Sequence, residues 1–147
     1  MKVREAMSRG AHVISAGETL KKAAQIMAQE DLGFLPVEEN DRLVGMITDR
    51  DIVTRCIAQG QDGSARVRDA MTMDVRYCFE GDDIDDVIEN MADIQVRRLP
   101  VLSSGKRLVG ILSLADVARA YSPDAVGVAF SGVVSPGGMH AGDASRH

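Results

Sequence analysis

Tryptophan is absent from the 147-residue sequence, and aromatic residues make up only 3% of it. The aliphatic residues and the eight methionines must therefore build the core. No apolar run approaches the roughly 20 residues that a membrane-spanning helix requires. The N-terminus carries charge where a signal peptide would need its apolar stretch. The sequence thus predicts a cytoplasmic protein with no membrane contact.

Only two cysteines are present, and acidic residues outnumber basic ones. Cys56 and Cys78 form neither a CxxC pair nor a metal-ligand spacing, which favours two reduced thiols packed as small apolar groups. The formal net charge of −5 argues against binding nucleic acid through bulk electrostatics. We therefore expect no metal site and no nucleic-acid partner.

The chain contains an internal duplication, and this is the strongest signal in the sequence. The segment VREAMS at 3–8 returns as VRDAMT at 67–72, a shift of 64 (67 − 3) that also carries the first LPV onto the second. One residue is then gained, so that LVG at 43–45 meets LVG at 108–110. Two copies of one structural unit are expected.

Each copy has the pattern of a β-α-β-β-α unit. Its first helix carries one apolar stripe at i, i+3, i+4 and i+7, formed in the first copy by Leu20, Ala23, Ala24 and Met27. Thr19 and Asp83 are the expected N-caps, and Gly33 is the expected stop of the first helix. A strand through LPV, a polar turn and the LVG strand then form a hairpin. The second helix is expected to bury Ile52, Val53, Cys56 and Ile57 in the first copy and Val117, Ala118 and Tyr121 in the second.

The fold class that follows is α/β (α+β), with two β-α-β-β-α repeats packed around a pseudo-two-fold axis. The predicted ranges are repeat 1 at 1–60, a linker at 61–66, repeat 2 at 67–121 and a C-terminal tail at 122–147. In the tail, Pro123 is expected to open a short helix that Pro136-Gly137-Gly138 ends, with a disordered or partner-bound end beyond it.

A hydroxyl and a carboxylate stand three residues apart in both copies, directly after the LVG strand. The pairs are Thr48 with Asp51 in GMITDRDI and Ser113 with Asp116 in GILSLADV. Taken singly, each pair is a capping box that satisfies the first backbone amides of a helix. Taken together, the free amides offer a seat for a phosphate, and the carboxylate offers an acceptor for a sugar diol. Both interpretations stay open at this point.

These motifs in this order resemble the cystathionine β-synthase (CBS) domain, and two in tandem resemble a Bateman module. The resemblance covers residues 1 to about 121. It implies a disc of two repeats whose clefts often bind adenosine-containing ligands such as AMP, ADP, ATP or S-adenosylmethionine. In that family the hydroxyl and the aspartate contact phosphate and ribose.

The resemblance also implies which residues line each cleft, with elements of both copies contributing. The first cleft would take Thr48, Arg50, Asp51 and Phe34, closed by Met71, Arg76 and Tyr77. The second would take Ser113, Asp116 and Arg98, closed by Met7, His12, Val13 and Gly33. Arg50 is replaced by Ala115, and Phe34 by Arg98, so the two affinities are expected to differ.

No catalytic constellation is visible, so we expect a regulatory module and not an enzyme. It would sense energy state through an adenine nucleotide, with no required cofactor, and signal through a homodimer or an effector protein. The alternative is a structural CBS pair that interacts with proteins while its own side chains fill the clefts. A nucleotide that binds the protein, and binds less once Asp51→Ala or Asp116→Ala is introduced, would favour the regulatory module over the structural pair.

Overall fold

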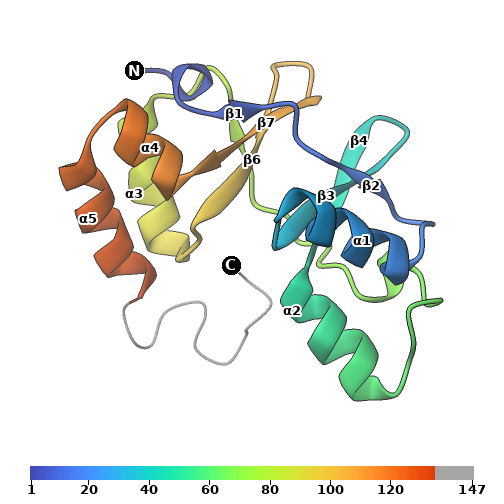
Figure 1. The fold of residues 1–147 in the computed structure, drawn as a ribbon. Coiled ribbons are helices and arrows are strands. Elements are labelled where there is room, and N and C mark those ends of the chain that lie inside the picture. Colours follow the sequence, from blue (N-terminus) through green and yellow to red (C-terminus); the bar gives the residue numbers. More distant parts are fainter. Residues whose placement is uncertain (135–147) are drawn as a thin grey trace. The chain divides into compact units, whose positions relative to one another are not determined.

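The computed structural model describes residues 1–134, which form two compact units. Residues 12–75 make one, called here the first-repeat unit; residues 1–11 together with the chain from 76 onward make the other, the second-repeat unit. Figure 1 traces both along the chain. The predicted stop at Pro136 and the predicted disorder beyond it lie outside the described residues. Within those residues, no helix is both long and apolar enough to cross a membrane.

The first-repeat unit is a three-stranded sheet with helices beside it. Strand β2 (Ile14–Ser15) pairs in parallel with β3 (Phe34–Glu39), which pairs antiparallel with β4 (Arg42–Thr48). Helix α1 (Leu20–Glu30) starts at the predicted cap Thr19, whose hydroxyl accepts from the amide of Lys22 at 3.1 Å. The helix ends at Asp31, in the left-handed conformation (φ 53°), and not at Gly33.

The second-repeat unit has the same order of elements with one strand more. Its sheet runs β1 (Ser8–Arg9), β7 (Leu108–Ser113), β6 (Arg98–Leu102) and β5 (Cys78–Phe79), with β5 and β6 parallel. Helix α3 (Ile84–Ile94) begins at the predicted cap Asp83. Helix α4 (Leu114–Ala120) follows β7 directly. The predicted α+β class is thus confirmed: the described residues contain two mixed sheets and the helices that accompany them.

Each unit buries one aliphatic core, as the scarcity of aromatic residues requires. The stripe of α1 lies against the LPV strand of β3, with Leu20, Ala23 and Leu35 each at most 1% exposed. In the second-repeat unit, Ile84, Val87 and Leu99 take the corresponding places at 0%, 4% and 1%. The burial of these apolar side chains is the main stabilising contribution in both units.

The segments that open the two sequence repeats are exchanged between the compact units. The first segment, 3–8, runs into β1, which pairs antiparallel with β7 of the second hairpin (Figure 1). The matching segment, 67–72, bonds to β4 of the first hairpin, where Met46 and Thr72 exchange backbone hydrogen bonds of 2.9 and 2.8 Å. The ranges 1–60 and 67–121 therefore describe the repeats along the sequence, whereas each compact unit takes its opening segment from the other repeat.

The second helices of the two repeats differ. In the first, α2 (Asp49–Asp51) runs on into a π-helical stretch (Ile52–Cys56) and a 3-10 turn (Ile57–Gln59). The prediction that this helix buries Val53 and Ile57 is wrong, because both are 58% exposed. Of the apolar residues in this stretch, only Cys56, at 0%, is fully buried in the core. Among the described residues of this unit, no further helix covers the outer face.

Helix α5 (Pro123–Val133) covers the corresponding face of the second-repeat unit, where it packs against α3 and α4 (Figure 1). Pro123 opens it, as predicted, and Ser122 caps it. The side-chain amide of Gln95 donates to the carbonyl of Gly132 at 2.8 Å. The guanidinium of Arg97 lies 5.3 Å from the centre of the Phe130 ring. Both contacts fix the helix against the end of α3 and the start of β6.

Candidate functional site

The first repeat places its hydroxyl and carboxylate at the junction of β4 and α2. Thr48 Oγ1 accepts from the amide of Asp51, and Asp51 Oδ2 accepts from the amide of Thr48, both at 3.0 Å. The two residues are 5% and 0% exposed. The capping-box interpretation is therefore confirmed for this pair. The box uses Oδ2, and Oδ1 lies 3.7 Å from Nε of Arg55, one helical turn further on.

The second repeat repeats this geometry at the junction of β7 and α4. Ser113 Oγ accepts from the amide of Asp116 at 3.0 Å, and Asp116 Oδ2 accepts from the amide of Ser113 at 3.1 Å. Asp116 Oδ1 accepts from Arg119 Nη2 at 2.5 Å and from Ser8 Oγ at 3.2 Å. The sequence analysis missed both partners. The i, i+3 spacing of Asp116 and Arg119 was a usable signal, whereas the contact with Ser8 depends on the exchanged segment.

The sheet register brings two predicted residues next to these motifs. Phe34 is the antiparallel partner of Thr48, and Arg98 is the antiparallel partner of Ser113. Side chains of directly opposite residues stand about 5 Å apart at their Cβ atoms. Each motif thus has a different neighbour across the strand: an aromatic ring in the first repeat and a guanidinium in the second. Arg97, one residue earlier, is engaged with Phe130 of α5.

Gly33 and Arg50 lie close to the first motif. The carbonyl of Gly33 accepts from the amide of Asp49 at 2.9 Å, and a Cβ on Gly33 would stand 3.3 Å from the Asp49 carboxylate. Arg50 is exposed, and its amide donates to Asp49 Oδ1 at 2.8 Å. Within the first-repeat unit, the predicted first-cleft residues Phe34, Thr48, Arg50 and Asp51 are therefore neighbours in space. Gly33, which was predicted to close the second cleft, lies beside them.

Of the residues predicted to close the clefts, Met71 lies beside Gly45 of β4 and Met7 beside Gly110 of β7. His12 is exposed, and its Nε2 stands 3.3 Å from Glu30 Oε2, so the imidazole forms an ion pair when it is protonated. Tyr77, at 42% exposed, meets Phe79 edge to face, with the ring centres 5.6 Å apart. Arg76 is exposed. Arg76 and Tyr77 belong to the second-repeat unit and His12 and Val13 to the first. Their closing role stays a prediction.

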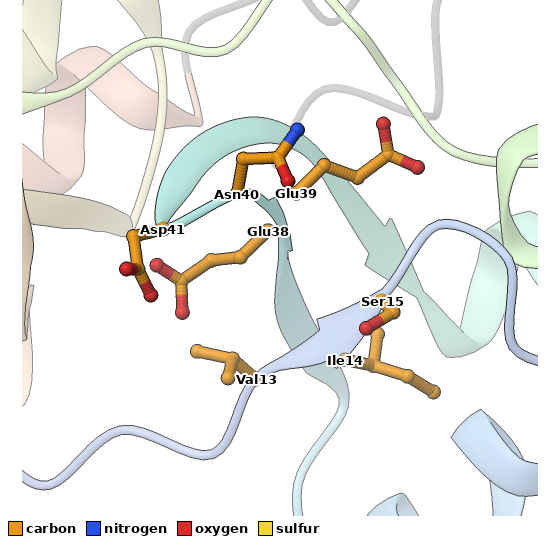
Figure 2. A pocket seen from close by; sticks show the side chains of 7 residues that line it. All are labelled: Val13, Ile14, Ser15, Glu38, Glu39, Asn40 and Asp41. Carbon is orange, nitrogen blue, oxygen red and sulfur yellow. The ribbon is translucent and has the colours of Figure 1, made fainter.

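One pocket, of about 350 Å³, lies in the first-repeat unit, at the end of β3 remote from Thr48. It contains Val13 but otherwise only residues outside the predicted set: Ile14, Ser15, Glu38, Glu39, Asn40 and Asp41. Figure 2 shows the Glu38 and Asp41 side chains directed toward the side on which Val13 lies, while Glu39 extends the other way. Three carboxylates make a poor site for a phosphate.

The second repeat carries apolar side chains at the corresponding strand positions. Where Ser15 pairs with Glu38 in the first-repeat unit, Phe79 pairs with Leu102 in the second, in the same parallel register. Among residues 1–134, no group of three or more His, Cys, Asp or Glu side chains is placed to hold a metal ion.

Two α+β units with matching hydroxyl–carboxylate junctions define a tandem-repeat protein. The family model for the CBS domain matches residues 3–57 and again 67–123. The chain belongs to the CBS domain family. It is 38% identical over 135 residues to Hypoxic response protein 1 of Mycobacterium tuberculosis (strain H37Rv), covering 90% of this chain and 94% of that protein.

Solved structures of the family are also similar. A structure of Hypoxic Response Protein I with two coordinated zinc ions is 40% identical, with a TM-score of 0.72 over 81% of this chain and 98% of that one. The CBS domain pair of protein MJ0100, in complex with methylthioadenosine and S-adenosyl-L-methionine, is 26% identical, with a TM-score of 0.72 over 84% and 98%. CBSX2 in complex with AMP is 26% identical, with a TM-score of 0.71 over 81% and 94%.

Proposed function

We propose that this protein is a regulatory module, not an enzyme, that binds an adenine nucleotide or another adenosyl ligand at its hydroxyl–carboxylate junctions. The observation that carries the proposal is the pair of buried carboxylates, Asp51 and Asp116, held in the same geometry in a chain of the CBS family. Two relatives of similar fold are in complex with AMP or with adenosyl compounds. The ligand would be AMP, ADP, ATP or S-adenosylmethionine.

The capping boxes support this role by fixing the carboxylates. Each box uses the amide hydrogen bond to Oδ2 to hold the side chain at the strand–helix junction, while Oδ1 faces the neighbouring side chains. A carboxylate held in this way is a preorganised acceptor for the two hydroxyls of a ribose. Arg98, opposite Ser113, and Arg50, beside Thr48, supply the positive charge for a phosphate.

The experiment is a thermal-shift and calorimetric titration of the full chain with the four candidate ligands. Ligand at about 100 times its dissociation constant adds roughly 2.7 kcal/mol to the free energy of unfolding. Asp51→Ala and Asp116→Ala should each reduce the binding stoichiometry or affinity. Asp83→Ala is the matched control, because it removes the cap of α3 from a helix that contributes no proposed ligand contact. Absence of a shift with every ligand at millimolar concentration contradicts the proposal.

We further propose that a second copy of the chain is the first partner, with an effector protein reading the change. Helix α5 covers α3 and α4, whereas the matching face of the first-repeat unit leaves Val53 and Ile57 each 58% exposed. A homodimer that buries this face supplies the missing cover. Val53→Asp and Ile57→Asp should shift the mass in solution from dimer to monomer, measured by light scattering. Val128→Asp, at a position 76% exposed on α5, is the control.

A further inference from the structure

The carboxylate of Asp116 already has three donors. Oδ2 accepts from the Ser113 amide, and Oδ1 accepts from both Arg119 and Ser8. An ionised carboxylate offers about four acceptor positions. One position is therefore left among the contacts of the described residues, and it lies on Oδ2. A sugar diol that donates two hydrogen bonds to this carboxylate must displace Arg119 or Ser8.

Arg119 is the donor whose side chain can swing away from the carboxylate. Its side chain is 70% exposed, and its described polar contact is this ion pair with Asp116, so water solvates the guanidinium once it is released. Ser8 belongs to β1, whose backbone is paired with β7, so its short side chain stays beside Asp116. A ligand at Asp116 thus meets a cation that must move aside and that stays within a side chain's length of the ligand.

The first repeat has no cation at the position of Arg119. The position that matches Arg119 under the shift of 65 (116 − 51) is Thr54, whose hydroxyl donates to the carbonyl of Arg50 at 2.8 Å. The arginine near Asp51 is Arg55, and its Nη1 also donates to the carbonyls of Ala70 and Met71 at 3.4 and 3.3 Å. Arg55 is therefore tied to the backbone of the opening segment 67–72.

The residue on the neighbouring strand is also positively charged in the second repeat and neutral in the first. The residue opposite Ser113 is Arg98, whereas the residue opposite Thr48 is Phe34. The second repeat thus carries one guanidinium group on the neighbouring strand and one on its own helix, whereas Arg50 and Arg55 of the first repeat both follow its strand–helix junction. A ligand with a negative group beside its sugar gains from both groups of the second repeat, whereas a neutral ligand only displaces one of them.

We propose that Arg119 is the specificity-determining residue of the second repeat, an inference that rests on the proposed function. Arg119 competes with the sugar for Asp116, and it strengthens the binding of ligands that carry a phosphate. AMP and methylthioadenosine are the matched probes, because they share adenine and ribose and differ at the 5′ position, where one has a phosphate and the other a neutral thioether. The second repeat prefers AMP; the first repeat discriminates less.

The test measures both dissociation constants by calorimetry for Arg119→Met in the Asp51→Ala background, in which only the second carboxylate remains. Methylthioadenosine should bind about threefold more tightly, because its competitor is gone, and AMP about tenfold more weakly, because its charged partner is gone. Arg119→Lys should restore most of the AMP preference. The control is Thr54→Met in the Asp116→Ala background, where the ratio of the two constants should not change.

The calorimetric results distinguish a failure of the role of Arg119 from a failure of the proposed nucleotide binding. If the full-length protein binds AMP but Arg119→Met changes both constants by the same factor, Arg119 does not select ligands and the inference is overturned alone. If neither ligand binds the unaltered protein, the proposed function and the inference fail together. Equal thermal stability of the ligand-free Arg119 variants, expected for a side chain so exposed, shows that any change in affinity is not a loss of fold.

Discussion

Gly110 of β7 lies directly beneath the backbone of Ser8, so that a Cβ on Gly110 would stand 2.5 Å from the Ser8 carbonyl oxygen. Gly45, the matching residue of β4, stands in the same relation to Thr72, with 2.9 Å between its Cβ position and that carbonyl oxygen. The glycine of each LVG run thus allows the opening segment of a repeat to dock on a hairpin. The close approach is made by the protein's own backbone.

Gly110→Ala should therefore destabilise the second-repeat unit by about 1–3 kcal/mol, because a methyl group there forces the β1 backbone away from β7. Urea denaturation measures the loss. Gly105→Ala is the control: it lies in the turn of the same hairpin, and its nearest neighbour to an added Cβ is Ser103 Oγ at 3.8 Å. It should change the free energy of unfolding by less than about 0.5 kcal/mol. Equal effects of the two substitutions contradict this account.

The exchange of opening segments predicts that a mutation near the N-terminus weakens the far end of the chain. Val3 is fully buried in the core of the second-repeat unit, and Val67 is fully buried in that of the first. Val3→Ala should cost about 2 kcal/mol and lower amide protection in β5, β6, β7 and α3. Val67→Ala should lower protection in β3, β4 and α1 instead. Hydrogen exchange read by mass spectrometry distinguishes the two patterns.

The reverse result would overturn the exchange. If Val3→Ala exposes α1 and β3 while the second repeat stays protected, each opening segment packs on its own repeat. A fragment of residues 12–75 gives a second check, because the first-repeat unit is continuous in the chain. It should fold alone, whereas a fragment that starts at 76 should not fold without residues 1–11.

Much of the fold could be predicted from the sequence because its signals are local. The apolar stripe of α1 and the caps Thr19 and Asp83 depend only on residue spacing and on short-range hydrogen bonds. The caps are confirmed, and so is the burial of Leu20, Ala23 and Met27, whereas the fourth stripe residue, Ala24, is exposed. The capping boxes at Thr48 and Ser113 are local in the same sense. The stop of α1 was misplaced, because Asp31 adopts the left-handed conformation two residues before Gly33.

The pairing of the opening segments could not be predicted from the pattern. VREAMS and VRDAMT are nearly identical, and both hairpins offer a glycine at the same place, so either segment fits either hairpin. Only the tertiary structure decides between these pairings. The contact between Ser8 and Asp116 was hidden for this reason. The exposure of Val53 and Ile57 was also missed, because periodicity identifies an apolar face without showing what covers it.

Substitution by alanine at two glycines of α5 should change the stability of the protein in opposite directions. A Cβ on Gly127 would meet no atom within 4 Å, so Gly127→Ala should stabilise the helix by about 0.5–1 kcal/mol. A Cβ on Gly132 would stand 2.9 Å from Ala92 Cβ and 3.2 Å from its carbonyl oxygen. Gly132→Ala should therefore push α5 off α3 and cost about 1–3 kcal/mol.

Thermal unfolding of the two variants gives the comparison directly. The unaltered protein should unfold at a temperature between those of Gly127→Ala and Gly132→Ala. The same sign for both would mean that α5 does not pack closely on α3. A double variant, Gly132→Ala with Ala92→Gly, removes the added clash on the other side, and it should recover part of the stability that the single change loses.

The Cys78 thiol should resist alkylation in the folded protein and lower the stability of the fold at alkaline pH. Burial, together with the nearby charge of Asp82, raises the pKa of Cys78 to about 12 from the ordinary value of 9.0. Because the thiolate is the reactive form, iodoacetamide at pH 8 should modify native Cys78 about a thousandfold more slowly than the unfolded chain.

Between pH 9 and 12 the unfolded chain loses this proton while the native protein retains it, so the free energy of unfolding falls as pH rises. Urea midpoints of the unaltered protein and of Cys78→Ala across that interval isolate this contribution, since all other groups titrate in both. Rapid alkylation of native Cys78 at pH 8, or parallel midpoint curves, would show that the thiol is not held neutral by the core.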